Sequence, residues 1–384
     1  MEFELTHRQK MLRDSIREIV ERELPREYLR ELDEKGEFPY KFYEKLAELG
    51  YFGLIYPKEY GGAEAGSMDL IIVGEELGRY CLDIGSGYET TMFSGLAILH
   101  HGTEGQKRYY IPRIIGGTQR FSLSITEPDA GSDAASIRTM AIQDGEYYVL
   151  NGQKVFASLA HLENNIIVLY ARTDDKVDTK HKGITAFLLD PKNKGVMIRR
   201  LNTLGRRIGG ANEIFLTDVR IPKENILGKL NEGWSVLVGE LDLERLFACS
   251  QYVGNTQTIV SDALDYAKKR VQFGRPIGSF QSIAHMIVNL QTEVEAARLL
   301  IYRAAWMYQK GLPCSKEISM AKLFVSELAV RAANAGMQVM GGYGYVMDSD
   351  MQRFFRDTRI LTIVAGTSQI QRNIIARHLG LKVT

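Results

Sequence analysis

A glutamate within an otherwise apolar helical stripe is the residue of this chain best suited to acid–base chemistry. The segment LVGELDLERLFACS, residues 237–250, has helical periodicity. Leu237, Leu241, Glu244 and Ala248 follow the i, i+4, i+7, i+11 spacing of one helix face. A carboxylate removed from water has a raised pKa, which suits a general base working near neutrality. Two interpretations are open: Glu244 takes part in catalysis, or it pairs with an arginine of a neighbouring helix.

A loop of small and hydroxyl residues before the last helix is a second candidate. It belongs to the segment LTIVAGTSQIQRNIIAR, residues 361–377, in which Ala365 and Gly366 allow a ligand or another chain to approach the backbone closely. Thr367 and Ser368 are N-cap candidates, and free N–H groups point outward at such a helix start. We therefore expect a binding edge here.

Other polar patterns have ordinary structural explanations when taken alone. The segment SITEPDAGSDAAS, residues 124–136, predicts a turn whose exposed N–H groups can hold an anion. Arg270 at a helix end is expected to be a surface or C-cap cation, and the Gly-Gly pair at 341–342 is a routine C-cap. Asp242 and Arg245 can form an i,i+3 ion pair.

The composition is that of an ordinary globular protein. Of 384 residues, 45% are hydrophobic and 25% are charged, and a formal net charge of +1 gives no field to attract nucleic acid or an anionic membrane. The N-terminus has no apolar signal region and no long apolar run occurs, so we expect a cytoplasmic protein. Cys81, Cys249 and Cys314 are too few for a disulfide framework, and the seven histidines never fall at metal-ligand spacing, so we predict no structural metal.

The periodicity divides the chain into helical, β-rich and helical regions. Residues 1–120 have helical spacing, as in QKMLRDSIREIVERELP. Residues 121–228 contain short β-rich runs, with hairpin signals at Asp144-Gly145 and Asn151-Gly152. Residues 229–384 contain long helical segments with short loops, which predict an antiparallel bundle. The fold class is therefore α+β, with an antiparallel β domain between two helical domains.

One acid of a core helix and one charged loop are expected to face solvent. In the segment DIGSGYETTMFSGLAILHHG, residues 83–102, Glu89, Thr90 and Thr91 sit among apolar neighbours and can line a pocket. We favour a core helix whose one central acid, Glu89, faces solvent, because glutamate is seldom buried without a partner. The charged loop at 172–183 is expected to be a solvated hairpin end.

Taken together, several motifs resemble the signature of the acyl-CoA dehydrogenases, a flavoenzyme family. They are TEPDAGSD at 126–133, RVQFGRPIGSFQ at 270–281, QVMGGYGY at 338–345 and the Gly-Thr loop at 366–367. The resemblance covers nearly the whole chain. It implies the helical, antiparallel β and four-helix-bundle-like domains of that family, FAD as cofactor, and a homotetramer built as a dimer of dimers. No strand–GxGxxG–helix unit is present, so a Rossmann dinucleotide site is not expected.

The resemblance implies a flavin site in two parts. In the first, residues 123–132 would wrap the flavin with Thr126 bonded to the isoalloxazine, while Phe156 would cover the ring and Ser158 would bond to N5. In the second, residues around Arg270 and the Gly-Gly pair would contact the FAD of a neighbouring subunit. The implied FAD-binding residues are Leu123, Ser124, Ile125, Thr126, Gly131, Ser132, Phe156, Ala157, Ser158, Arg270, Gln272, Phe273, Phe280, Gln281, Gln338, Gly341, Gly342, Thr367 and Gln369.

A departure from the family pattern points to the base. Many members carry a catalytic glutamate immediately before the Gly-Thr pair, where this chain has Ala365. The motif LDLERL at 241–246 resembles isovaleryl-CoA dehydrogenase, which has its base on this helix and likewise has alanine in the loop. The resemblance therefore implies Glu244 as the base and the backbone N–H of Ala365 as a donor to the thioester oxygen. The implied substrate-binding residues are Ser132, Asp242, Arg245, Gly366 and Arg377.

The implied activity is α,β-dehydrogenation of a short-, branched- or cyclic-chain acyl-CoA thioester to the 2,3-enoyl-CoA. Electrons would pass to an electron-transfer flavoprotein. Two alternatives stay open: an enoyl-CoA reductase of the same fold, and a flavin- or acyl-CoA-binding protein without turnover if Glu244 is only structural.

Overall fold

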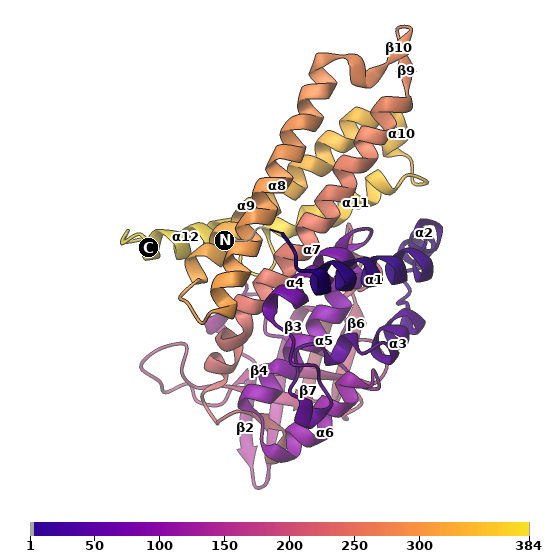
Figure 1. The fold of residues 1–384 in the computed structure, drawn as a ribbon. Coiled ribbons are helices and arrows are strands. Elements are labelled where there is room, and N and C mark those ends of the chain that lie inside the picture. The colour runs from indigo at the N-terminus through magenta and orange to yellow at the C-terminus, as the bar shows by residue number, and fades with distance from the viewer. Residues whose placement is uncertain (1–3, 384) are drawn as a thin grey trace.

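The N-terminal part of the chain is helical, as its periodicity predicts. The computed structural model describes residues 4–383, and Figure 1 shows these first helices packed beside the sheet. The first helix begins with a capping box, in which the Thr6 hydroxyl accepts from the Gln9 N–H and the Gln9 side chain accepts from the Thr6 N–H. The helices are α1 (His7–Glu23), α2 (Arg26–Lys35), α3 (Tyr40–Glu48), α4 (Ser67–Gly78), α5 (Leu82–His101) and α6 (Glu104–Ile115).

The middle region is a mostly antiparallel sheet, as predicted. Its strand order is β6-β7-β3-β2-β4-β5-β8, and β1 joins at the side by pairing in parallel with β4. This parallel pair is possible because the β2–β3 hairpin lies between the two strands in sequence and gives the chain room to cross over. The strands are β1 (Arg120–Ser124), β2 (Met140–Asp144), β3 (Tyr147–Ser158), β4 (Asn165–Arg172), β5 (Ile184–Leu189), β6 (Val196–Arg200), β7 (Ala211–Pro222) and β8 (Ile226–Leu227).

One of the two predicted hairpin turns is a β-bulge instead. Asp144-Gly145 does join β2 to β3, with Gly145 at φ +59°. Asn151-Gly152 lies inside β3, where the register against β7 shifts between Leu150 and Gly152. A Cβ on Gly152 would approach the Thr139 hydroxyl to 2.5 Å, so this glycine serves the close contact between two chain segments.

The C-terminal region is a bundle of long helices that projects from the body (Figure 1). A small hairpin of β9 (Val271–Gln272) and β10 (Arg275–Pro276) lies at its far end, near the short helix α10 (Gly342–Tyr345). Its other helices are α7 (Gly233–Lys269), α8 (Gln281–Gln309), α9 (Ser315–Met340), α11 (Asp350–Thr358) and α12 (Ser368–His378).

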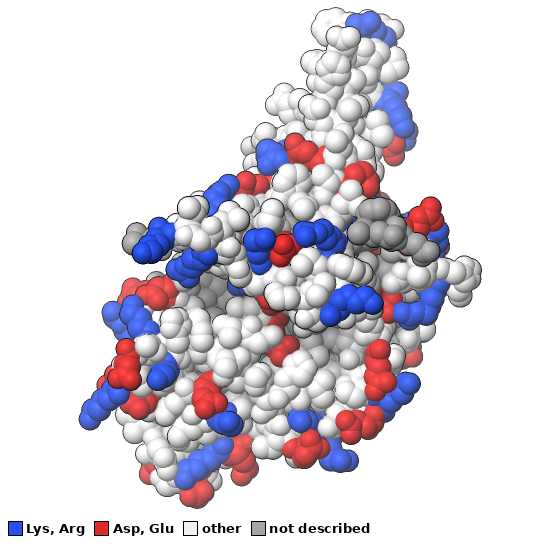
Figure 2. Space-filling view, turned by 60° about the vertical axis from the view of Figure 1, so that its left-hand side comes forward, with Lys and Arg blue, Asp and Glu red and all other residues white. Residues whose placement is uncertain are grey.

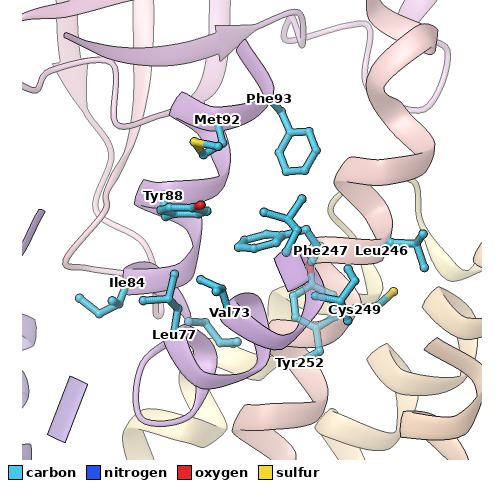
Figure 3. Packing of buried hydrophobic residues seen from close by; sticks show 14 of the residues in the cluster. Val73, Leu77, Ile84, Tyr88, Met92, Phe93, Leu246, Phe247, Cys249 and Tyr252 are labelled. Atoms are coloured by element: carbon cyan, nitrogen blue, oxygen red, sulfur yellow. The ribbon is translucent and has the colours of Figure 1, made fainter. Parts of the chain in front are cut away.

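Helix α7 connects the bundle to the rest of the molecule because it packs closely against α4 and α5. A Cβ on Gly78 would lie 2.5 Å from the Gln251 backbone, and a Cβ on Gly254 would lie 2.0 Å from the Glu75 carbonyl oxygen. Figure 3 shows the aromatic part of this contact, where the rings of Tyr88 and Phe247 stack with centroids 5.6 Å apart. The backbone of α7 is therefore held at a fixed distance from the N-terminal helices.

The surface carries mixed charge. Figure 2 shows basic and acidic side chains interspersed over the face in view, in keeping with the net charge of +1. Within residues 4–383, no helix is long and apolar enough to cross a membrane, and no cluster of His, Cys, Asp and Glu could hold a metal ion. Cys81, Cys249 and Cys314 are buried free thiols.

A buried ion pair supports the turn that follows β1. Lys154 of β3 is fully buried, and its Nζ donates to Glu127 Oε1 at 2.7 Å and to the Ile125 carbonyl at 3.1 Å. Glu127 also accepts from the Arg138 and Thr139 N–H groups at 2.6 and 2.9 Å. Burial works to raise the pKa of Glu127, but the Lys154 charge and these donors hold it below its usual value.

We predict that Glu127→Gln lowers the free energy of unfolding by about 3–5 kcal/mol, because it leaves Lys154 buried without its counter-charge. Denaturant titration of the purified protein measures this change. The control is Glu127→Gln combined with Lys154→Met, which removes both charges and should recover most of the loss. A single variant that unfolds at the same denaturant concentration as the wild type would contradict the prediction.

Candidate functional site

A cavity of about 430 Å³ lies between α5, α7, the sheet and the loop before α12. Glu244 and Ala365, the two predicted catalytic positions, both line it. Phe156 and Ser158 of β3, predicted to contact a flavin ring, line it as well. The folded chain thus brings together residues from positions 156 to 365 that the sequence analysis selected separately.

Glu244 faces this cavity from the middle of α7. Its Oε2 is buried and has no hydrogen-bond partner within residues 4–383. The predicted alternative, an ion pair with an arginine of another helix, is not seen among the described residues, and the adjacent Arg245 pairs instead with Asp242 at 3.6 Å. Burial raises the pKa of Glu244, while the charges of Arg245 and Lys322 oppose the rise. One oxygen of the carboxylate is therefore desolvated, on a side chain that lines the cavity.

Glu89 is the second carboxylate of the cavity, and the expectation that it faces solvent is wrong. Its side chain is buried, and its Oε2 accepts from Gln251 Nε2 at 2.7 Å. Burial and then the neighbouring charge of Glu244 raise the pKa of Glu89 to about 8. The reason is that α5 is enclosed on most sides by α4, α6, α7 and β1, so its small-residue sequence leaves no solvated face.

The loop that contains Ala365 is fixed by donors to its carbonyl oxygens. Lys322 of α9 donates to the carbonyls of Leu361 at 3.0 Å and Gly366 at 2.7 Å, and Gln371 donates to that of Ala365 at 3.2 Å. Ala365 has φ +53°, an uncommon value for a residue with a Cβ. The donors hold this conformation and leave the Ala365 N–H without a hydrogen bond among the backbone pairs of residues 4–383.

Lys322 is the functional candidate that the sequence analysis missed. It is fully buried, and burial lowers its pKa to about 8. The signal was present: Ile318, Lys322, Val325 and Ala329 follow the helical spacing of one apolar face, as Glu244 does on its own helix.

The predicted helix cap and the ion pair on α7 are both present. The Thr367 hydroxyl accepts from the Ile370 N–H at 3.1 Å, which confirms Thr367 as the N-cap of α12. Asp242 accepts from the Ser315 hydroxyl at 3.0 Å, and Arg245 Nε donates to the Ala365 carbonyl at 3.4 Å. Arg245 therefore also supports the loop.

The residues predicted to bind the flavin near this cavity differ in their exposure to solvent. Leu123 and Phe156 are 37% and 63% exposed, and Phe156 is held at φ +60°. Ser132 and Gly131 are also exposed. In contrast, Ser124 and Ala157 are buried and do not line the cavity. The exposed apolar side chains of Leu123 and Phe156 are of the kind that a planar ring would cover.

The second predicted flavin segment forms a separate pocket of about 680 Å³ at the far end of the bundle. Arg270, the residue after α7, lies with its guanidinium 5.5 Å from the centre of the Tyr343 ring. Phe273 is 94% exposed. The predicted residues that line this pocket are Arg270, Gln272, Phe273, Phe280, Gly341 and Gly342. Gln281 and Gln338 do not line this pocket but are adjacent in sequence to residues that do. Gln369 and Arg377 are exposed and lie elsewhere, on α12.

Family models match three consecutive parts of the chain. Residues 6–118 match the N-terminal domain of acyl-CoA dehydrogenase, residues 122–219 match the middle domain, and residues 231–380 match the C-terminal domain.

Individual relatives match over nearly their full length. The chain is 40% identical over 373 residues to the caffeyl-CoA reductase-Etf complex subunit CarC of Acetobacterium woodii, covering 96% of this chain and 97% of that protein. It is 38% identical over 377 residues to the 3-(aryl)acrylate reductase of Clostridium sporogenes, covering 97% and 99%. The structure of butyryl-CoA dehydrogenase from Megasphaera elsdenii superposes with a TM-score of 0.93 at 31% identity, covering 99% and 100%.

The raised pKa of Glu89 predicts a pH-dependent stability. Between about pH 4.5 and 8 the folded protein holds a proton that the unfolded chain has released, so this residue lowers stability increasingly as pH rises through that window. Glu89→Gln does not titrate, and its amide oxygen can still accept from Gln251. We expect the variant's midpoint of thermal unfolding, relative to wild type, to be higher at pH 8 than at pH 5.5. A difference that stays constant between these pH values would refute this.

Proposed function

The chain belongs to the acyl-CoA dehydrogenase family of flavin-dependent oxidoreductases, and we propose that it forms a 2,3-double bond in a short-, branched- or cyclic-chain acyl-CoA thioester with Glu244 as the general base. The observation that carries this proposal is the buried Glu244 Oε2, which has no hydrogen-bond partner within residues 4–383 and lies on the cavity that Ala365 also lines. A carboxylate in such a place has the raised pKa that a base needs.

The residues around Glu244 suit proton removal beside a thioester carbonyl. As the α-proton leaves, negative charge develops on the thioester oxygen and requires hydrogen-bond donors already in place. The Ala365 N–H is such a donor, because Lys322, Gln371 and Arg245 bond to the neighbouring carbonyls and hold the loop. Glu89, with a pKa of about 8, is mostly neutral at pH 7 and adds little repulsion to the charge of Glu244.

FAD, the cofactor of this family, fits the exposed apolar groups on the cavity rim. When bound, it supplies the acceptor for the β-hydride. We propose that Leu123 and Phe156 cover its ring, that the Ser158 hydroxyl bonds to it, and that Thr126 and Ser132 contact it from the turn after β1. Gly341 and Gly342 lie at the far end of the bundle, where an added Cβ would meet no atom of residues 4–383 within 4 Å, which leaves room for the FAD of a second copy.

This separation of the two flavin segments supports an oligomer. We propose a homotetramer in which Arg270, Gln272, Phe273, Phe280, Gln281, Gln338 and the Gly-Gly pair serve a neighbour's FAD, together with Thr367 and Gln369. Asp242, Arg245, Gly366 and Arg377 are proposed to contact the CoA part of the substrate. The same proposal includes domain boundaries at 120 and 228, a cytoplasmic location and an electron-transfer flavoprotein as electron acceptor.

A second candidate is the reverse reaction. The relatives at 40% and 38% identity are named as a caffeyl-CoA reductase subunit and an arylacrylate reductase, and the first name includes an Etf complex. In the reductive direction Glu244 would begin protonated and donate its proton to the α-carbon, so the same residues serve both directions. Comparing turnover of saturated and 2,3-unsaturated thioesters with matched acyl chains distinguishes the two candidates.

We predict that Glu244→Gln slows anaerobic bleaching of the flavin by a saturated acyl-CoA at least about a hundredfold, because the amide cannot take the α-proton. FAD content and folding should be unchanged. The matched control is Glu89→Gln, which alters the other carboxylate of the cavity. If Glu244→Gln bleaches at the wild-type rate and Glu89→Gln does not, then Glu89 is the base instead of Glu244. A wild-type flavin that no thioester bleaches or reoxidises would indicate a binding protein without turnover.

A further inference from the structure

A small chamber continues from the central cavity on the side of Glu244 and ends at another carboxylate. It measures about 80 Å³ and shares Glu89, Thr90 and Glu244 with the main cavity. Its walls are largely apolar, but Ser94, Tyr170 and Glu240 also line it. An acyl chain whose α-carbon lies at Glu244 can extend into this chamber, so its end would meet polar groups.

Glu240 is incompletely bonded although it is buried. Its side chain is 9% exposed, and one oxygen, Oε1, lies 2.7 Å from His100 Nδ1 of α5. The other oxygen, Oε2, has no hydrogen-bond partner among residues 4–383. Buried carboxylate oxygens are costly to leave unpaired, so a free one beside a cavity is suited to a donor supplied by a ligand.

The contact with His100 determines which kind of donor suits the free Oε2 of Glu240. The hydrogen bond with Glu240 raises the pKa of His100, although burial and Lys107 act against the rise. One oxygen of Glu240 is therefore already paired with His100. Tyr170 of β4 and Ser94, Glu89 and His101 of α5 lie near Glu240 from other elements, and the remaining walls are largely apolar. A hydroxyl fills the free oxygen with its single donor, whereas an ammonium group brings three N–H donors into a chamber whose walls are largely apolar.

We propose that the chamber binds the end of an acyl chain that carries a hydroxyl group, with Glu240 as the acceptor that selects it. The inference rests on the proposed function for the position of the thioester. Glu240 and Glu244 are four residues apart on α7, about 6 Å along its axis. Four bonds from the α-carbon to a hydroxyl oxygen span about 5 Å, given bonds of roughly 1.5 Å in a zigzag. The selected substrates are therefore short hydroxyacyl thioesters.

The test compares two thioesters of equal size, 5-hydroxypentanoyl-CoA and hexanoyl-CoA, which differ by a hydroxyl in place of a methyl group. Calorimetry gives their Kd values on FAD-loaded protein carrying Glu244→Gln, in which reaction is slow. The same background with Glu240→Leu removes the acceptor at similar volume. The control is Glu232→Gln in that background, because this carboxylate precedes α7 and does not line either cavity.

We expect the hydroxylated thioester to bind about tenfold more tightly than hexanoyl-CoA when Glu240 is present, since hydrogen bonds to charged groups are the stronger kind. Glu240→Leu should reverse the order, and Glu232→Gln should leave it unchanged. Equal Kd values with Glu240 present would overturn the proposal even if Glu240→Leu fails to fold. A preference that survives Glu240→Leu would also overturn it, as would tighter binding of 5-aminopentanoyl-CoA than of the hydroxyl compound.

Failure of this proposal can be told apart from failure of the proposed function. If no thioester changes the flavin spectrum of the wild-type protein, the proposed oxidoreductase activity fails, whatever the Kd values are. If both thioesters bleach the flavin and bind equally, the activity stands and only the assignment of Glu240 fails.

Discussion

The burial of one Glu244 carboxylate oxygen, Oε2, is the constraint on which the rest of the site depends. It follows from the packing of α7, whose backbone contacts α4 directly at Gly78 and Gly254. Any side chain at these two positions would push α7 outward and admit water. The same packing buries Glu89 beside Glu244, and the resulting repulsion is relieved because the pKa of Glu89 rises to about 8. The packing of α7 against α4 and α5 therefore also determines the protonation of Glu89.

A second constraint is that the loop opposite Glu244 must present an N–H group and not a side chain. Buried Lys322 achieves this by bonding to the carbonyls of Leu361 and Gly366, which flank Ala365. The charge of Lys322 also limits how far the pKa of Glu244 rises. In the proposed function a base on the helix and an alanine in the loop are complementary, because the space and the backbone donor left at 365 would be useful only if the carboxylate comes from α7.

Much of this could be predicted from the sequence where the signal is local. The spacing of Glu244 indicates its place within an apolar helix face, Thr367 caps α12, and Asp144-Gly145 turns a hairpin. Predictions failed where burial depends on distant segments. Glu89 looked solvent-facing because its neighbours in sequence do not show that α6, α7 and β1 enclose α5. The carbonyls that Lys322 meets lie 39 and 44 residues further along the chain, so no local pattern indicates them.

The central claim, that one α-carbon is addressed from α7 instead of from the loop, is tested most directly by moving the carboxylate. Stopped-flow bleaching should be compared in Glu244→Gly and in Glu244→Gly combined with Ala365→Glu. The account predicts that the double variant recovers part of the rate lost in the single variant, because the new carboxylate reaches the same proton. Recovery should be incomplete, since catalysis is sensitive to small misplacement. A double variant as slow as the single one, with FAD bound normally, would contradict the account.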